Sequence, residues 1–209
     1  ALVTPLNLRV VSRASSAGPA RARNEGWRAT SAPVVAFTDD DCIPSPGWLA
    51  SGLAALGRDP QVGVLQGTTL PEEGEPLDGF VATRHIEGPT PFFEACNLFL
   101  RRRALEQSGG FDEELALHFE DTALGWAVLD AGWKRGFTAD ALVHHDVTRP
   151  GVGWHLRKAL LDGHAVKVAR DHPSFRRALW SPWCIEARRA AFAVAVLAAI
   201  ATGQPRLWF

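Results

Sequence analysis

A short apolar run followed at once by three aspartates limits the folds open to this chain of 209 residues. The run Val34–Phe37 reads VVAF, and a single threonine separates it from Asp39, Asp40 and Asp41. A continuous apolar run of this length is typical of a strand that is buried on both faces. We therefore expect a sheet covered by helices on both sides, with an acidic site at the carboxyl end of this strand.

The rest of the chain alternates between strand-like and helix-like segments. Helices are expected over residues 18–31, 46–57, 101–108 and 119–131, and strands over residues 34–37, 62–69, 92–100 and 141–143. Proline near the start of the first helix and glycine after the last one support these bounds. Alternation of this kind predicts an α/β fold with a mixed, mostly parallel sheet that binds its ligands at the strand ends.

Overall composition excludes several classes of protein. Hydrophobic residues make up 46% of the chain, which is enough to form a folded core. The 22 basic and 23 acidic residues nearly cancel, which argues against a nucleic-acid-binding protein. The three cysteines are far apart in the sequence and form no CxxC pair, so they do not indicate a zinc knuckle.

Charge is unevenly distributed along the chain. Residues 149–209 hold ten Lys and Arg against three Asp and Glu, so this segment is strongly basic. Trp180, Trp183, Arg188 and Arg189 precede an apolar run over residues 190–201, which is shorter than the ~20 residues that span a bilayer. Two interpretations stay open: a segment that lies at a membrane interface, and a C-terminal helix packed on the domain.

The aspartate triplet points to a metal ion. Three adjacent carboxylates repel one another, and a divalent cation would relieve that repulsion. Oxygen ligands favour Mg²⁺ or Mn²⁺. The alternative is an acidic cap on the helix that follows, because carboxylates stabilise the positive end of a helix, but a single aspartate would serve that purpose.

Two further polar pairs are ambiguous by themselves. Glu120 and Asp121 open a predicted helix, where acidic residues are common as caps. His144 and His145 follow a predicted strand, where paired histidines are more often surface or core residues than ligands. A histidine at that strand end could nevertheless complete a metal site together with an aspartate.

The order of these motifs carries a resemblance to a known family. The segments are GPARARNEGWRAT, VVAFTDDDCIPSPGWL, ACNLFLRRRALEQSGGFDEEL, FEDTALGWAVLDAGWK and LVHHDV. Together, over about residues 7–147, they resemble a family 2 glycosyltransferase with the GT-A fold. The resemblance implies a GT-A glycosyltransferase domain over residues 1–148, followed by a basic helical tail over residues 149–209. It also implies that the family's first strand–helix unit, which forms much of the nucleotide pocket, is not within this sequence.

The resemblance assigns donor and metal roles to the first acidic cluster, which corresponds to the family's DxD motif. Asp39 and Asp40 are then expected at the nucleotide-sugar donor, with Asp39 contacting the ribose or nucleotide. Asp41 is expected to hold the Mg²⁺ or Mn²⁺ that bridges the diphosphate. Arg101 falls in a segment that the family uses for the donor.

The resemblance also assigns roles to residues later in the chain. Asp121 corresponds to the general base that deprotonates the acceptor hydroxyl. Asn97 and Glu120 are expected to bind the acceptor, and His144 or His145 to contact the metal. The implied activity is a metal-dependent, inverting transfer of a sugar to an acceptor hydroxyl. The acceptor could be lipid-linked, saccharide or another hydroxyl compound, in cell-envelope polysaccharide or glycolipid synthesis at the cytoplasmic face of the membrane.

Two other functions remain open at this point. A nucleotidyltransferase is also an α/β enzyme that uses acidic residues and Mg²⁺, but it does not require the ED pair or the GGFDE turn. A non-catalytic domain of the same fold is the second alternative. It would have no reason to retain the acidic residues Asp39, Asp41 and Asp121, since acidic clusters cost stability.

Overall fold

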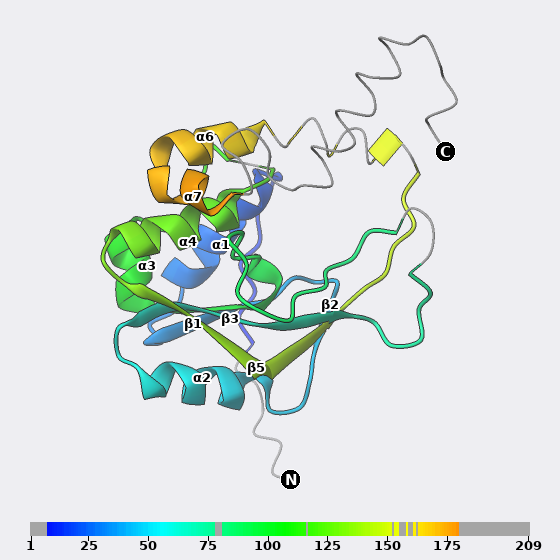
Figure 1. Ribbon diagram of the computed structural model, residues 1–209, viewed down its shortest axis with the longest axis horizontal. Helices are drawn as coiled ribbons and strands as arrows, with labels where there is room; N and C mark the ends of the chain where they lie inside the picture. The colour runs from blue at the N-terminus through cyan, green and yellow to red at the C-terminus, as the bar shows by residue number, and fades with distance from the viewer. Residues whose placement is uncertain are drawn as a thin grey trace.

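The computed structural model describes residues 8–77, 81–115, 117–151, 153–154, 158, 161 and 163–179. A five-stranded sheet lies between helices on both of its faces (Figure 1). The strands lie side by side in the order β1-β4-β3-β5-β2. Their bounds are β1 (Val34–Phe37), β2 (Cys42–Pro44), β3 (Val62–Pro71), β4 (Leu98–Arg101) and β5 (Lys134–His145). The expected α/β/α architecture is confirmed.

The sheet is mixed, but less parallel than expected. Strands β1, β3 and β5 run in one direction, while β4 and β2 run in the opposite direction. Of the four neighbouring pairs among the described strands, only β3–β5 is parallel. The short strands β2 and β4 follow turns rather than crossover helices, so they enter the sheet antiparallel to their neighbours. The carboxyl ends of β1, β3 and β5 consequently meet at one edge.

Helices cover both faces of the sheet, and two later helices, at residues 164–171 and 173–178, lie on the outer side of another helix rather than on the sheet (Figure 1). The larger core cluster lies beneath five helices, and the smaller one lies beneath a single helix. The five are α1 (Gly18–Arg28), α3 (Arg102–Ser108), α4 (Glu120–Asp130), α6 (His164–Asp171) and α7 (Pro173–Ala178), and the single helix is α2 (Trp48–Arg58). Helix α1 ends three residues before the predicted end at residue 31. Helix α4 begins and ends within one residue of the predicted bounds, 119 and 131.

Close packing of α2 depends on a glycine. A β-carbon at Gly52 would come within 2.3 Å of the Phe99 ring of β4, so only glycine allows this approach. Trp48, on the same helix, lies against Phe99 with ring centroids 5.0 Å apart. This contact fixes the helix that follows the aspartate triplet against the sheet.

Two predicted strands differ from the structure, and one strand was not predicted. The segment predicted as a strand over residues 92–100 pairs in the sheet only from Leu98, because a 3-10 turn occupies Ala95–Asn97. Strand β5 is far longer than the expected 141–143, because exposed polar residues interrupt the apolar pattern by which a strand is predicted. Strand β2 is only three residues long and ends in a proline at the sheet edge, so no pattern predicted it.

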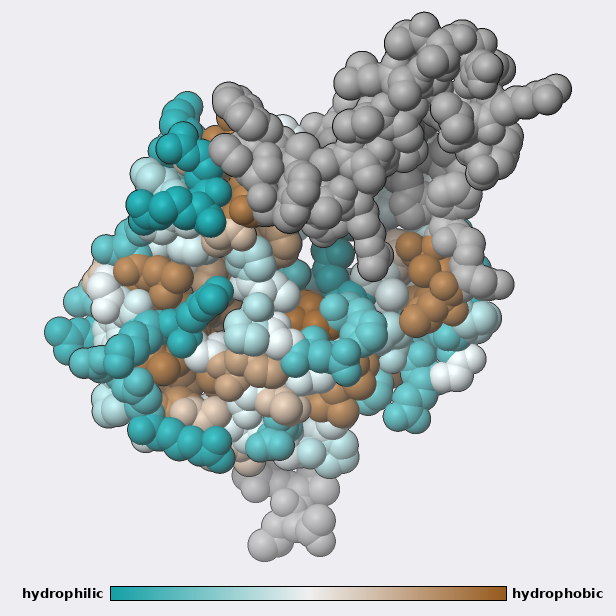
Figure 2. All heavy atoms as spheres, in the orientation of Figure 1, coloured by the Kyte–Doolittle hydropathy of each residue, from teal (hydrophilic) through white to brown (hydrophobic). Residues whose placement is uncertain are grey.

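Part of the predicted tail belongs to the main core. Val168 of α6 and Phe175 of α7 are completely buried, and the Phe175 ring lies 5.9 Å from that of Trp126 in α4. The apolar run over residues 190–201 lies outside the described residues. In the part of the chain that is described, no helix is both long and apolar enough to cross a membrane. Hydrophilic residues break up the apolar patches on the described surface seen in Figure 2.

Candidate active site

Polar side chains gather where the carboxyl ends of the three codirectional strands meet. Asp39 follows β1, His145 ends β5, and Asn97 precedes the antiparallel β4 at the same edge. The loop after β1 returns through β2, whose Cys42 pairs with His145. The sheet topology therefore brings together residues that are about a hundred positions apart in the sequence.

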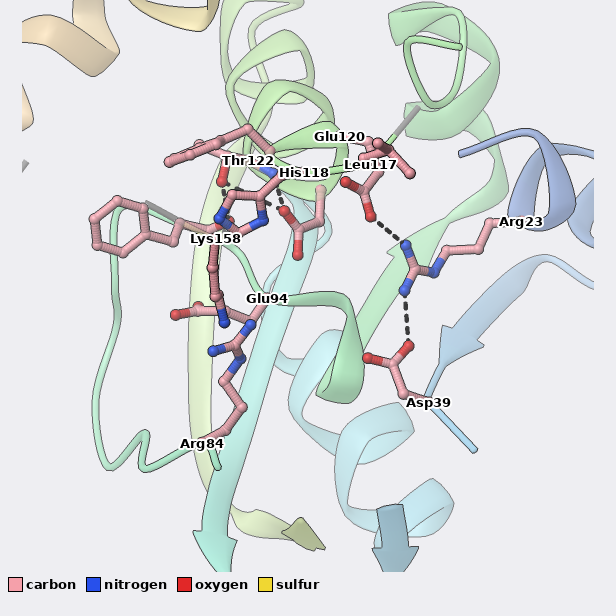
Figure 3. Close-up of a pocket in the computed structure, with 12 residues that line it drawn as sticks. Arg23, Asp39, Arg84, Glu94, Leu117, His118, Glu120, Thr122 and Lys158 are labelled. Carbon is pink, nitrogen blue, oxygen red and sulfur yellow. Dashed lines mark hydrogen bonds and ion pairs between the residues drawn. The ribbon is translucent and has the colours of Figure 1, made fainter. Parts of the chain in front are cut away.

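A cavity of about 280 Å³ opens at this edge (Figure 3). Its walls come from α1, the loop after β1, the 81–94 segment, the start of α4 and Lys158. The lining residues are Arg23, Asp39, Arg84, Phe92, Glu94, Leu117, His118, Phe119, Glu120, Asp121, Thr122 and Lys158. Both acidic and basic side chains face the space, so it suits a ligand with several polar groups.

Arg23 connects two of the acidic residues. Its guanidinium donates hydrogen bonds of 2.7 Å to Asp39 Oδ1 and 2.6 Å to Glu120 Oε1 (Figure 3). The Glu120 side chain is only 8% exposed, so this ion pair compensates its burial. The two carboxylates in turn raise the pKa of Arg23 despite the burial of the guanidinium. Arg23 therefore fixes the first aspartate of the triplet beside the first residue of α4.

Asp121 is held by backbone N–H groups. Its Oδ2 accepts a hydrogen bond of 3.1 Å from the Ala95 amide, and its Oδ1 accepts one of 2.7 Å from the Thr122 amide. Burial of the carboxyl group, together with the negative charges of Glu120 and Glu94, raises the pKa of Asp121 to about 7. A carboxylate with such a pKa accepts a proton far more readily than an ordinary aspartate.

Glu94 provides a second fixed carboxylate on the same wall. Its Oε2 accepts hydrogen bonds of 2.7 Å from Gln66 Nε2 and 2.6 Å from the Thr90 hydroxyl. Arg84 and Lys158 approach this side of the cavity, as Figure 3 shows. Burial and the nearby Lys158 lower the pKa of His118, which favours its neutral form. This wall therefore combines acidic, basic and neutral imidazole groups.

Backbone strain is concentrated beside this cavity. Phe119, directly before Glu120, has a φ of 70°, and Phe93, directly before Glu94, has a φ of 52°. Left-handed conformations of residues other than glycine cost on the order of 1–3 kcal/mol and are frequent at functional sites. The strain directs the acidic residues that follow each phenylalanine into the cavity.

The other two aspartates of the triplet line a second hollow of about 230 Å³. Its lining residues are Asp40, Asp41, Cys42, Ile43, Glu72, His144 and Asp146. Next to it, single ligand atoms of Asp41, Cys42 and His145 lie within 4.8 Å of one another. Oxygen, nitrogen and sulfur donors at this spacing fit a divalent transition-metal cation.

The motif order and this geometry agree with the comparison to known families. The sequence profile of glycosyl transferase family 2 matches residues 2–111, which is more than half of the chain. The chain belongs to glycosyl transferase family 2. The resemblance inferred from the motifs is thereby confirmed.

Two of the chain's relatives are glycosyltransferases that are longer than this chain. A pre-mycofactocin glycosyltransferase of Mycobacterium tuberculosis is 31% identical over 180 residues, which cover 80% of this chain and 38% of the relative. Glycosyltransferase AglE of Haloferax volcanii is 29% identical over 147 residues, which cover 66% of this chain and 48% of AglE. The chain thus spans less than half the length of each of these relatives.

Solved structures share the family 2 fold. The mannosyltransferase PcManGT of Pyrobaculum calidifontis, in complex with GDP-Man and Mn²⁺, has a TM-score of 0.59 and 21% identity. That match covers 95% of this chain and 62% of PcManGT. S. aureus TarS 1–349, in complex with UDP-GlcNAc, has a TM-score of 0.53 and 19% identity over 70% of this chain and 44% of TarS. These likenesses confirm the GT-A fold.

The structure distributes the predicted family 2 site residues between the two hollows. Asp39, Glu120 and Asp121 line the cavity, whereas Asp40, Asp41 and His144 line the second hollow. His145 faces the Asp41 carboxylate, with Nε2 3.6 Å from Oδ2. His144 projects from the opposite face of β5, and its Nδ1 lies 3.5 Å from the Pro71 carbonyl. The roles of these residues remain predictions.

Asn97 does not reach the cavity that an acceptor would enter. Its side chain is completely buried and bridges three elements of the fold. Nδ2 donates to the carbonyls of Thr68 and Ala141 at 2.7 and 2.8 Å, and Oδ1 accepts from Trp48 Nε1 at 2.8 Å. All of these hydrogen bonds are internal, so the expected acceptor contact is corrected to a structural role.

The position of Arg101 also differs from the one expected for a donor-binding residue. It ends β4 at the opposite edge of the sheet from the cavity. Its guanidinium donates to the carbonyls of Val62 at 2.8 Å, Leu56 at 2.6 Å and Asp59 at 3.3 Å. The bonds to Leu56 and Asp59 satisfy carbonyls at the end of α2, as basic side chains often do at helix C-termini, and the bond to Val62 reaches the start of β3. The expected donor contact is therefore not supported by its position.

Sequence reasoning assigned no role to Arg23, Cys42 or Glu94. Arg23 belongs to an arginine-rich helix whose sequence does not distinguish one arginine from the others. Glu94 lies in the segment that the sequence predicts as a strand. Cys42 directly follows the triplet, and its adjacency to three aspartates was the one available signal.

Proposed function

We propose that this chain carries the catalytic domain of a metal-dependent, inverting glycosyltransferase that moves a sugar from a nucleotide-sugar to an acceptor hydroxyl. The observation that most directly supports this proposal is that Asp121 lines the same cavity as Asp39 and has its pKa raised to about 7. Complexes of family 2 structures with GDP-Man and with UDP-GlcNAc support a nucleotide-sugar donor.

Asp121 acts as the general base in this proposal. Its carboxylate takes the proton of the acceptor hydroxyl as the hydroxyl oxygen forms a bond to the anomeric carbon. The bond from that carbon to the diphosphate breaks, and the nucleoside diphosphate leaves with the electron pair. Attack opposite the leaving group inverts the anomeric centre. The amides of Ala95 and Thr122 orient the carboxylate, and the Thr122 hydroxyl makes a longer contact of 3.4 Å with Oδ1.

Asp39 is proposed to bind the ribose of the donor, and Asp41 is proposed to bind its diphosphate through the cation. Arg23 orients Asp39 toward the ribose, and Asp40 lies next to it in the acidic loop. Asp41 and His145 would hold the divalent cation, whose charge stabilises the departing diphosphate when it is bound. Mn²⁺ in the PcManGT complex supports such a cation, and Mg²⁺ remains a proposal.

The acceptor side is proposed to lie at the wall formed by Glu94, Glu120 and the segment from His118 to Asp121. Glu120, paired with Arg23, would contact acceptor hydroxyls at the rim. The basic segment over residues 149–209 suggests a lipid-linked or cell-envelope acceptor at a cytoplasmic membrane surface, since Lys and Arg gain about 1 kcal/mol each near anionic lipids. Binding to anionic vesicles at low salt that weakens with added salt would support this location, and no binding would refute it.

A nucleotide-binding experiment tests the central proposal. We expect Mn²⁺ together with one of UDP, GDP, dTDP or CDP to raise the melting temperature of the chain. We expect Asp41→Asn to abolish the shift and Asp59→Asn, a half-buried aspartate at the far end of α2, to retain it. The same panel with nucleoside triphosphates tests nucleotidyl transfer, and a response confined to triphosphates would overturn our proposal.

A further inference from the structure

Three different ligand atoms meet beside the second hollow. The Nε2 atom of His145 lies 3.6 Å from Asp41 Oδ2, and the Cys42 sulfur lies 3.7 Å from Asp41 Oδ1. Tetrahedral zinc, with bonds of about 2.0–2.3 Å, places neighbouring ligand atoms about 3.3–3.7 Å apart. The two Asp41 distances involve its two different carboxylate oxygens, and the three ligand atoms lie within 4.8 Å of one another, so small side-chain movements would bring them to tetrahedral spacing.

The backbone holds this cluster in place. Cys42 and His145 are directly paired across the antiparallel strands β2 and β5, so their side chains project from the same face. The Asp146 amide donates a hydrogen bond of 2.9 Å to the Asp41 carbonyl, which extends the pairing by one step. Ligands on paired strands are positioned more precisely than ligands on a free loop.

His145 is already oriented as a metal ligand. Its Nδ1 lies 2.8 Å from the Asp146 carbonyl oxygen. A carbonyl only accepts hydrogen bonds, so Nδ1 carries a proton, and in the neutral ring Nε2 has the lone pair that faces Asp41. Metal-binding histidines commonly have this arrangement, with the second ring nitrogen donating to a carbonyl or carboxylate.

The sulfur atom changes which cation the site selects. Thiolate ligands favour Zn²⁺ and similar softer cations, whereas Mg²⁺ and Mn²⁺ prefer oxygen. We propose that Asp41, Cys42 and His145 form a site for a zinc-class cation, with Cys42 as a thiolate ligand, that binds Zn²⁺ more tightly than Mn²⁺ or Mg²⁺. The bound cation replaces the thiol proton, which is released to solvent.

Three protein ligands leave one tetrahedral position open. Asp41 lies at the rim, with its side chain 46% exposed, so the open position is accessible from the second hollow. Zinc sites with three protein ligands and an open position bind a water or a substrate oxygen there. The inference rests on the proposed function only in that Asp41 is the ligand expected to hold the donor's cation.

Cobalt substitution tests the thiolate directly. Co²⁺ added to the full chain under a non-chelating reductant is expected to give one equivalent of a thiolate-to-cobalt charge-transfer band. We expect Cys42→Ser to lose this band. Cys184→Ser is the control, because it removes a cysteine that is not one of the proposed ligands. We expect that variant to retain the band.

Competition then tests the selectivity. Zn²⁺ should displace the bound Co²⁺ at a concentration at least tenfold lower than Mn²⁺ requires. His145→Gln should weaken Co²⁺ binding at least tenfold, which provides a second readout if Cys42→Ser does not fold. Circular dichroism of each variant establishes that it is folded.

Several results would overturn the inference. They are the absence of a charge-transfer band in the wild-type chain, its persistence in folded Cys42→Ser, and equal competition by Mn²⁺ and Zn²⁺. The nucleotide experiment separates this inference from the proposed function. A wild-type chain that binds a nucleoside diphosphate with Mn²⁺ but gives no band refutes the thiolate site alone. A band without any nucleotide response leaves the zinc-class site standing and counts against the donor site.

Discussion

Arg23 donates a hydrogen bond of 2.7 Å to Oδ1 of Asp39 and thereby separates the first aspartate of the triplet from the other two. The same guanidinium reaches Glu120, so α1 holds the acidic loop and the start of α4 together. Asp40 and Asp41 line the second hollow instead. An acidic triplet that looks uniform in the sequence is therefore divided between two sites.

Arg23→Ala is expected to destabilise the protein by about 2–4 kcal/mol, because it leaves the buried Glu120 carboxylate without its partner. The positive charge of Arg23 also lowers the pKa of Asp121, so its removal should move that pKa above 7. Chemical denaturation measures the first effect. The second should appear as a shift of the activity profile to higher pH.

Arg21→Ala provides the control for Arg23. Arg21 lies on the same helix, but its side chain is 52% exposed and its nearest carboxylates are 3.7 Å away. Exposed pairs of this kind contribute about 0–1 kcal/mol. Equal losses of stability in both variants would show that the Arg23 bridge has no special role.

Asp121→Asn should lower kcat by about 10²–10⁴-fold while the affinity for the nucleoside diphosphate stays unchanged, because an amide cannot accept the hydroxyl proton. In the wild-type enzyme the active form is the carboxylate, so activity should increase as the pH rises through about 7. The variant should lose this dependence. Wild-type activity that stays constant between pH 6 and 8 would contradict the assignment of Asp121 as the base.

The raised pKa of Asp121 also predicts how stability depends on pH. Between its unfolded pKa of about 3.9 and its folded pKa of about 7, the native state binds more protons than the unfolded state. The contribution of Asp121 to stability therefore falls as the pH increases across this range. Asp121→Asn removes the buried charge and should be more stable than the wild type at pH 8, by about 4 kcal/mol. Thermal unfolding at pH 5 and pH 8 measures the difference, which should fall to less than half at pH 5 and vanish only below about pH 4.

The parts of the site that the sequence predicted are those set by short-range patterns. The apolar run before Asp39 and the acidic pair at Glu120 and Asp121 are continuous in the sequence, and the ends of codirectional strands meet at one edge. Arg23 and Glu94 join the cavity through tertiary contacts that no local pattern records. The split of the triplet between two hollows likewise depends on the position of α1.

Asn97 and Arg101 show a second limit on predicting site residues from the sequence alone. Both lie on the same sequence segment as cavity residues, yet one side chain is directed into the core and the other lies at the far edge of the sheet. A polar residue buried next to a strand, such as Asn97, needs internal partners, and the fold supplies them through β3, β5 and α2. Sequence order alone does not distinguish such a residue from one that faces a ligand.

This structural role of Asn97 predicts the effect of Asn97→Ala. The substitution leaves the carbonyls of Thr68 and Ala141 and the indole N–H of Trp48 without partners, at a cost of about 3 kcal/mol. Trp48→Phe removes a single donor and should cost about 1 kcal/mol. Urea denaturation compares the two. A fully stable Asn97→Ala with weakened acceptor binding would restore the acceptor role that the structure does not support.

Phe175→Ala tests whether the start of the basic tail is integral to the domain. Phe175 is completely buried and contacts Trp126 and Phe92 with ring centroids 5.9 and 6.4 Å away. Truncating such a phenylalanine creates a cavity and costs about 3–5 kcal/mol. Val166→Ala, on α6, is the matched control, because Val166 is 71% exposed and its truncation should change stability by less than about 0.5 kcal/mol.

Phe92 lines the cavity beside Asp121, so Phe175→Ala should also reduce activity, even at temperatures where the variant remains folded. Unchanged stability in Phe175→Ala would mean that α7 does not pack on α4 in solution.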